Sequence, residues 1–75
     1  MFYDFCITDN QKMVYEALIG LSKKGSFIAI QELDYLGIHR SEISKVLLYF
    51  EEKGILDNVQ HLNEMYPVLF SLKPH

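Results

Sequence analysis

The sequence predicts a small α+β domain in which three helices pack with a β-hairpin. Two segments carry apolar residues at helical spacing, and a glycine follows each of them. Near the end of the chain, Val68, Phe70 and Leu72 alternate with Leu69 and Ser71, as expected for a two-faced hairpin strand. Of the 75 residues, 49% are hydrophobic and 13% aromatic. We therefore expect one domain over residues 1–75, with a stability on the order of 4–11 kcal/mol.

The first long helix is expected to begin after Thr8 and to end at Gly25. Thr8 and Gln11 have the spacing of a capping box, in which each side chain accepts a backbone N–H of the other residue. Lys23 and Lys24 suit the negative end of the helix dipole. Glycine in the left-handed conformation is a common helix stop. The apolar stripe of this helix consists of Val14, Ala17, Leu18 and Leu21.

A short strand and a brief helix are expected next. Bulky and β-branched residues at 26–29 favour a strand. The brief helix covers about residues 30–36, with Leu33 and Leu36 pointing inward. Gly37 and its neighbour then form a turn.

The second long helix is expected over about residues 40–53, and Gly54 ends it. His39 falls at the N-cap, and Glu42 is placed to complete half of a capping box. The apolar stripe again follows the i, i+3, i+4, i+7 spacing, with Ile43, Val46, Leu47 and Phe50.

The rest of the chain predicts a hairpin. Residues 55–60 read as one strand, residues 61–64 as the turn and residues 65–72 as the return strand. Pro67 fits only near a strand start or on an edge, because proline has no N–H to donate. The inward residues of the return strand are expected to be Val68, Phe70 and Leu72.

The order helix, strand, helix, helix, strand, strand is that of a winged helix-turn-helix. The helix-turn-helix would cover about residues 30–53 and the wing about residues 55–72. Residues 36–45 read Leu-Gly-Ile-His-Arg-Ser-Glu-Ile-Ser-Lys, and residues 52–56 read Glu-Lys-Gly-Ile-Leu. These segments resemble the turn, the recognition helix and the entry to the wing in MarR-like regulators and in plasmid or phage replication-initiator domains.

The resemblance implies that the second long helix lies in the DNA major groove, with its first residues at base edges. At about 100° per residue, the side opposite the apolar stripe holds Ser41, Lys45, Leu48 and Glu52, and Ser44 and Tyr49 flank it. The expected DNA contacts are Arg40, Ser41, Ser44 and Lys45, with Lys23 and Lys24 as outlying phosphate contacts. For Arg40 and Lys45 the alternative is solvated charges on an exposed helix face, and for the two serines it is local helix capping. For Lys23 and Lys24 the alternative is stabilisation of their helix end.

Charge and cysteine content bound the function further. Seven basic and ten acidic residues give a net charge of −3, so the arrangement of charges must decide whether DNA can bind. Cys6 is the only cysteine, which excludes an intramolecular disulfide and fits a reducing cytoplasm. There is no run of about 18 apolar residues for a membrane span. Asp4, without a basic residue before it, does not fit a signal peptide.

The sequence gives no sign of catalysis. It has no nucleophile elbow, glycine-rich phosphate loop or paired-histidine zinc motif. Cys6 and the three histidines lack metal-ligand spacing. Glu51 and Glu52 are adjacent, and adjacent helix residues point apart. We therefore expect no enzymatic activity, no metal and no cofactor.

These observations lead to two functional hypotheses. The first is a sequence-specific double-stranded DNA-binding protein, a small cytoplasmic transcriptional regulator. A homodimer is expected, because one module with few positive charges would bind weakly. The second is a protein-interaction winged helix, an adaptor or inhibitor in a larger complex. It follows from the net charge, from a wing without Lys or Arg, and from Leu48 and Tyr49 on the exposed face. The aromatic residues Phe2, Tyr3 and Phe5 would cover a core edge or form a self-association surface.

Overall fold

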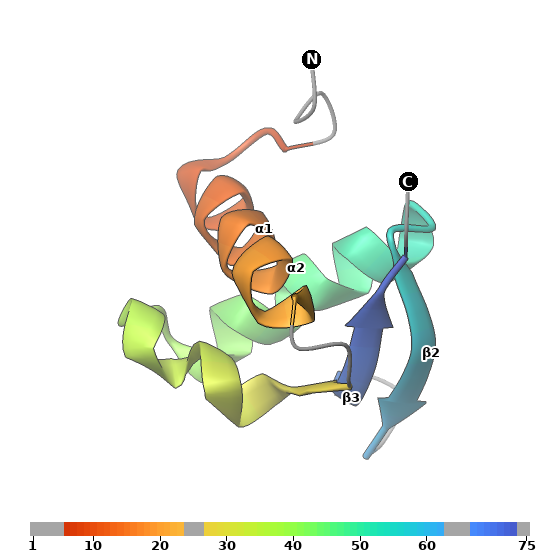
Figure 1. Ribbon diagram of the computed structural model, residues 1–75. Helices are drawn as coiled ribbons and strands as arrows, with labels where there is room; N and C mark the ends of the chain where they lie inside the picture. The colour runs from red at the N-terminus through yellow and green to blue at the C-terminus, as the bar shows by residue number, and fades with distance from the viewer. Residues whose placement is uncertain (1–5, 24–26, 63–66, 74–75) are drawn as a thin grey trace.

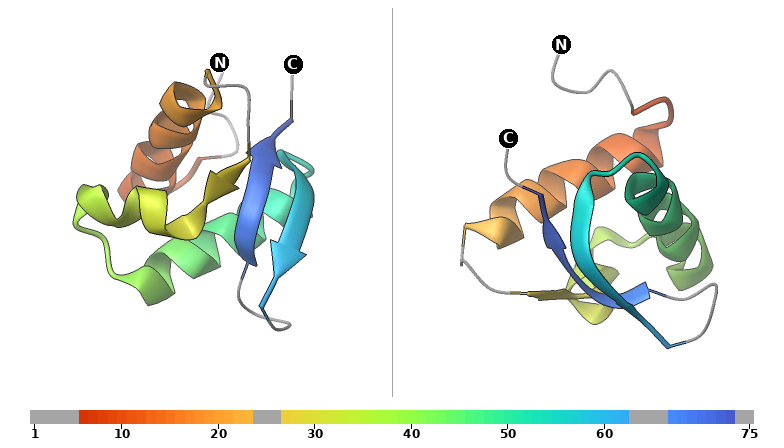
Figure 2. Two further views of the ribbon diagram at one scale, coloured as in Figure 1. Left: turned by 60° about the horizontal axis from the view of Figure 1, so that its bottom comes forward. Right: turned by 90° about the vertical axis from the view of Figure 1, so that its right-hand side faces the viewer.

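The computed structural model describes residues 6–23, 27–62 and 67–73. Three helices lie on one side of a small sheet (Figures 1 and 2). In chain order, the elements are α1 (Asp9–Ser22), β1 (Ile28–Ala29), the 3-10 helix η1 (Ile30–Leu36), α2 (Arg40–Glu52), β2 (Leu56–His61) and β3 (Pro67–Leu72). The predicted α+β class is confirmed, and the element order is compatible with a winged helix.

The start of α1 is the capping box that the sequence predicts. Thr8 Oγ1 accepts the Gln11 N–H at 3.2 Å, and Gln11 Oε1 accepts the Thr8 N–H at 3.2 Å. The same Gln11 oxygen also accepts the Ile7 N–H at 2.6 Å. One glutamine therefore satisfies two backbone donors ahead of the helix. At the other end, α1 stops at Ser22, and the predicted stop at Gly25 lies outside the described residues.

The core lies where α1, α2 and the sheet meet. Both predicted stripes face it, although Leu21 is only partly buried. Tyr15 is also buried, with 1% of its surface exposed, and its ring makes an edge contact with Phe50 at a centroid distance of 6.0 Å. The sequence stripe omits Tyr15. The other fully buried large side chains include Leu18, Ile28, Ile30, Leu33, Ile43, Leu47 and Phe70.

The brief helix is confirmed with the predicted bounds, as a 3-10 helix. Its start is held by Glu32, whose Oε2 accepts the Ala29 N–H at 2.8 Å. Leu33 is fully buried, whereas Leu36 is half-buried. Gly37 ends η1 at φ 74°, and its N–H donates to the Asp34 carbonyl at 3.2 Å. A side chain is strained at that φ, so the turn requires glycine.

The sheet is antiparallel, with the order β1-β3-β2. β3 is the central strand, and Pro67 is its first residue, a position where the missing N–H is tolerated. Phe70 is fully buried, whereas Val68 and Leu72 are half-buried. Of the three residues predicted to point inward, only the middle one is therefore fully covered. β1 is shorter than predicted, since Phe27 lies outside it.

β2 and β3 are joined through a β-bulge that the sequence analysis does not predict. Asp57 pairs with Ser71 and Gln60 pairs with Leu69, so two residues of β2 face Phe70 alone. One of these two is Asn58, at φ 53°, a conformation that asparagine tolerates better than most residues. Of the predicted hairpin turn, His61 belongs to β2, and residues 63 and 64 lie outside the described part of the chain.

Candidate nucleic-acid interface

The candidate interface is the start of α2, which follows η1 after a short turn. His39 is the N-cap, as predicted, and its Nδ1 accepts the Ser41 N–H at 3.4 Å. The Ser41 hydroxyl lies 3.0 Å from the same nitrogen. Glu42 does not complete a capping box, because its carboxylate is directed to Lys45. Ser41 therefore contributes to the cap while its side chain stays exposed.

Arg40 is held against η1 by a two-point hydrogen bond. Its Nε donates to Asp34 Oδ1 at 3.1 Å, and its Nη2 donates to Asp34 Oδ2 at 2.7 Å. The side chains of Arg40 and Asp34 remain 38% and 52% exposed. This fork fixes the plane of the guanidinium at the start of α2. An anion reaching Arg40 would meet the Asp34 carboxylate beside it.

Lys45 lies one turn further along α2 and is fully at the surface. Its Nζ is 3.5 Å from Glu42 Oε1, and the two side chains are 74% and 49% exposed. A pair this exposed and this long holds its partners weakly. A phosphate can therefore compete with Glu42 for Lys45.

Ser44 is placed differently from the sequence prediction. It is 6% exposed, and its hydroxyl has no hydrogen-bond partner within the described part of the chain. Ser44 lies four residues after Arg40, and residues at this spacing share one side of a helix. That side is the one on which Arg40 reaches back to η1, so Ser44 faces inward. The prediction that Ser44 lies beside the exposed face is wrong.

The two apolar residues predicted to be exposed on α2 are both half-buried. Tyr49 packs against the core, with its ring centroid 6.0 Å from that of Phe50. The Lys53 ammonium lies 5.5 Å from the centre of the Tyr49 ring. Leu48 and Tyr49 thus offer less apolar surface than the sequence predicts. The large apolar side chains that the structure records as exposed are Ile7, Met13, Phe27, Tyr35 and Leu62.

The two lysines predicted as outlying phosphate contacts are far from α2 in sequence. Lys23 is the C-cap residue of α1 and is exposed, with its backbone N–H bonded to the Leu21 carbonyl. This position fits the alternative of a helix end. Lys24 lies outside the described residues.

The strands β2 and β3 and the residues that join them add no Lys or Arg to the interface. Residues 55–72 contain neither Lys nor Arg. The histidine of this segment, His61, lies at the end of β2, with Nε2 at 2.9 Å from Glu51 Oε1 of α2. This contact ties the end of β2 to α2. Within the candidate interface at the start of α2, the positive charges are therefore those of Arg40 and Lys45.

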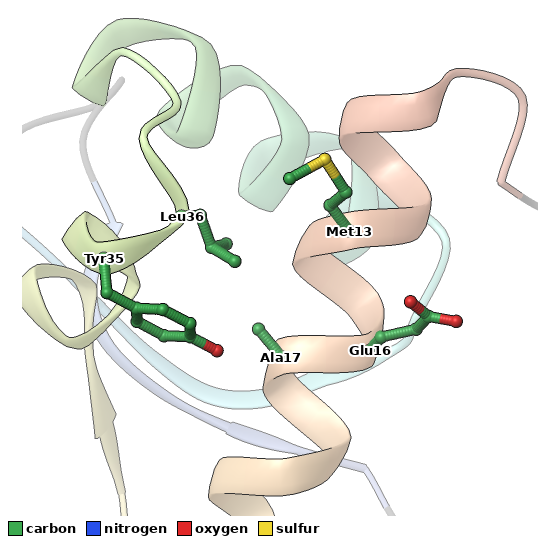
Figure 3. Close-up of a pocket in the computed structure, with 5 residues that line it drawn as sticks. All are labelled: Met13, Glu16, Ala17, Tyr35 and Leu36. Carbon is green, nitrogen blue, oxygen red and sulfur yellow. The ribbon is translucent and has the colours of Figure 1, made fainter.

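A pocket of about 360 Å³ lies between α1 and η1 (Figure 3). Met13 and Ala17 of α1 point across it toward Tyr35 and Leu36, whereas the Glu16 carboxylate points outward. The pocket is open to solvent. Its lining is mostly apolar and carries no cation, so it does not extend the candidate DNA surface.

Cys6 is buried just ahead of α1. Burial raises the pKa of its thiol, Lys12 opposes the increase and Glu16 adds to it. The protonated thiol is a poor nucleophile and a poor metal ligand. The described residues bring together no group of three His, Cys, Asp or Glu that could hold a metal ion.

Two features of this region were missed by the sequence analysis. Asp34 was not singled out, although an acid in the brief helix and an arginine just past the glycine turn are well spaced to pair. The pocket is not predicted by the sequence, since its walls come from two separate elements.

No helix in the described part of the chain is long and apolar enough to cross a membrane. No protein-family model, curated protein or solved structure matches this chain.

Proposed function

We propose that this chain is a winged helix-turn-helix protein that binds double-stranded DNA, with the first half of α2 in the major groove. The observation that carries the proposal is the two-sided build of α2. Its inner side is fully buried at Ile43, Leu47 and Phe50. Its outer side presents Lys45, and Arg40 lies on the flank beside η1 with its side chain 38% exposed. A rigid helix with donors at its first turns is the form in which such folds read base edges.

Arg40 is the proposed specificity residue. Arginine reads guanine with two parallel hydrogen bonds, which demands a fixed guanidinium plane. The two-point contact with Asp34 supplies that constraint. Ser41, exposed at the same turn, is a further donor for a phosphate or a base.

Lys45 is the proposed phosphate contact, and Lys23 and Lys24 remain outlying candidates. So few cations on a chain of net charge −3 imply modest affinity. A homodimer on a two-fold site would compensate by doubling the contacts. Within this proposal the protein is a small transcriptional regulator that acts in the cytoplasm.

The direct test is a fluorescence-anisotropy titration of a mixed-sequence duplex at about 50 mM and about 200 mM salt. Three or four phosphate contacts would weaken binding by roughly two decades over that range. The double variant Arg40→Ala with Lys45→Ala should weaken binding and lower the salt slope by about one, because Lys45 is the phosphate contact of the pair.

The matched control is Lys53→Ala with Lys73→Ala, which removes the same charge from exposed sites away from the start of α2. The control should bind almost as well as the parent chain. Equal losses in the two double variants would mean that net charge, and not the start of α2, determines binding. That result would refute the proposed surface.

The second candidate function is a protein-interaction domain. It is favoured by the engagement of Arg40 by Asp34 and of Lys45 by Glu42, which lowers the positive potential of α2. Absence of duplex binding at micromolar protein and low salt would favour it over DNA binding. Capture experiments would then compare the parent chain with the variant Leu48→Gln, Tyr49→Gln. A stoichiometric partner that binds the parent chain and the variant equally would exclude Leu48 and Tyr49 as the contact surface.

A further inference from the structure

The outer face of α1 is not covered by any other described element. All of its residues are exposed, and it alternates in charge along its length. The residues of this face are Asp9, Lys12, Met13, Glu16, Gly20 and Lys23.

An apolar patch borders this face. Met13 is 40% exposed and Tyr35 is 71% exposed, and between them lies the pocket with Ala17 and Leu36 in its lining. Figure 3 shows these side chains converging from α1 and η1. Covering exposed apolar surface is favourable by about 25 cal/mol per Å².

Two opposite charges stand beside this patch on α1. Lys12 and Glu16 are one helical turn apart, and neither forms an ion pair with another described residue. The charges of α2 differ in this respect, since Arg40 and Lys45 each have a carboxylate partner. Lys12 and Glu16 therefore offer one positive and one negative group beside the patch.

We propose that a second copy of this chain docks on this face, with the two α1 helices antiparallel about a two-fold axis. In an antiparallel pair centred near residue 14, Lys12 of each copy lies opposite Glu16 of the other. A two-fold interface repeats each contact, so one complementary pair becomes two. Parallel helices would instead place like charges together.

The same arrangement brings the apolar groups together. With the pair centred between residues 14 and 15, Met13 of one copy also lies close to Ala17 of the other, at the edge of its pocket. The exposed Tyr35 ring then adds to the covered area. Methionine fits irregular gaps and contacts aromatic rings favourably. The interface would thus have an apolar centre and a charged rim.

This proposal does not rest on DNA binding. It concerns α1 and η1, whereas the proposed DNA surface is the start of α2. A failure of one is therefore distinguishable from a failure of the other: the first is read from the molecular mass in solution, the second from duplex titration.

The test is sedimentation equilibrium of the full chain and of three variants. The parent chain should be a reversible dimer. Lys12→Glu alone and Glu16→Lys alone should each weaken dimerisation by about tenfold or more, because both reciprocal pairs become like-charged. The double variant Lys12→Glu, Glu16→Lys restores opposite charges and should recover most of the affinity.

Matched controls are Lys73→Glu and Glu52→Lys, which make the same changes of charge at exposed sites away from α1. They should dimerise like the parent chain, and circular dichroism should be the same for all variants. Met13→Glu should also abolish the dimer by placing a charge at its centre.

Three results would overturn the proposal. The first is a monomeric parent chain up to about 1 mM, which corresponds to an association weaker than about 4 kcal/mol. The second is a dimer that single charge reversals do not weaken more than the controls do. The third is a double variant no better than the single ones. A monomeric parent chain would mean that this face does not bind a second copy. Either of the other two results would mean that the dimer interface lies elsewhere.

Discussion

The first turns of α1 and α2 are stabilised by different kinds of contact. A helix start leaves backbone N–H groups without partners. At α1 these groups are satisfied locally, by Thr8 and Gln11 three residues apart. At α2 the cap is His39, and the start is additionally held by a contact from Arg40 back to Asp34 across the turn. Local contacts stabilise one helix, whereas a contact between elements positions the other.

This difference separates a structural helix start from a candidate functional one. The α1 cap uses neutral side chains, whose hydrogen bonds stay intact in salt. The α2 start uses charged groups that remain accessible to an incoming anion. The following variants alter the start of α1 or the region around the start of α2. They are given in order of decreasing expected effect.

Gly37→Ala should affect the α2 start most. The φ of 74° would force a Cβ into a strained conformation, at a cost of about 1–2 kcal/mol. The measurement is the free energy of unfolding by urea. Gly20→Ala is the control, because Gly20 lies in α1 with open space around its Cβ position, and alanine there should stabilise by up to about 1 kcal/mol. Equal effects at the two glycines would show that the turn does not require its left-handed residue.

Thr8→Ala should break the α1 start at a cost of about 1 kcal/mol, because the Gln11 N–H loses its acceptor. The loss should be the same at low and at high salt. Thr8→Ser keeps the hydroxyl and should retain most of the stability. A marked salt dependence would contradict a cap made of neutral groups.

Asp34→Asn should lower stability by less than about 1 kcal/mol, because the pair with Arg40 is well exposed. The loss should shrink as salt is added, in contrast to that of Thr8→Ala. If the start of α2 binds DNA, the same substitution should raise affinity for a mixed-sequence duplex, since one negative charge is removed beside Arg40. Weaker binding would mean that holding Arg40 in place matters more than that charge.

Ser44→Ala should have the smallest effect, a gain in stability of up to about 1 kcal/mol. The buried hydroxyl has no partner in the described part of the chain, and removing it relieves a desolvation cost. Duplex affinity should not change, since Ser44 faces inward. A loss of duplex affinity with unchanged stability would mean that Ser44 does contact the DNA.

The sequence predicted what depends on neighbours along the chain. The capping box, both apolar stripes, the turn at Gly37 and the N-cap at His39 all rest on residues within a few positions of one another. Their chemistry is local, so spacing alone identifies them. Pro67 at a strand start was readable for the same reason.

Contacts between distant elements were not predicted. Tyr15 lies off the α1 stripe and is buried in the core, where its ring contacts Phe50 of α2. Ser44 lies at the border of the α2 stripe, where spacing does not tell which flank is covered. The pairing of Arg40 with Asp34 depends on the angle between η1 and α2. At the candidate site the sequence therefore indicated the residue types, and packing determined which of them stay accessible.

The bulge at Asn58 has a consequence for how this chain behaves beside its own copies. β2 is an edge strand, and an edge strand offers unpaired backbone groups on which another chain can add a strand. The left-handed residue breaks the regular spacing of those groups, and Asp57 next to it carries a charge. A strand interrupted in this way is a poor template for cross-β growth. The outer edge of β2 is therefore a poor place for another chain to add a strand, although no other element covers it within the described residues.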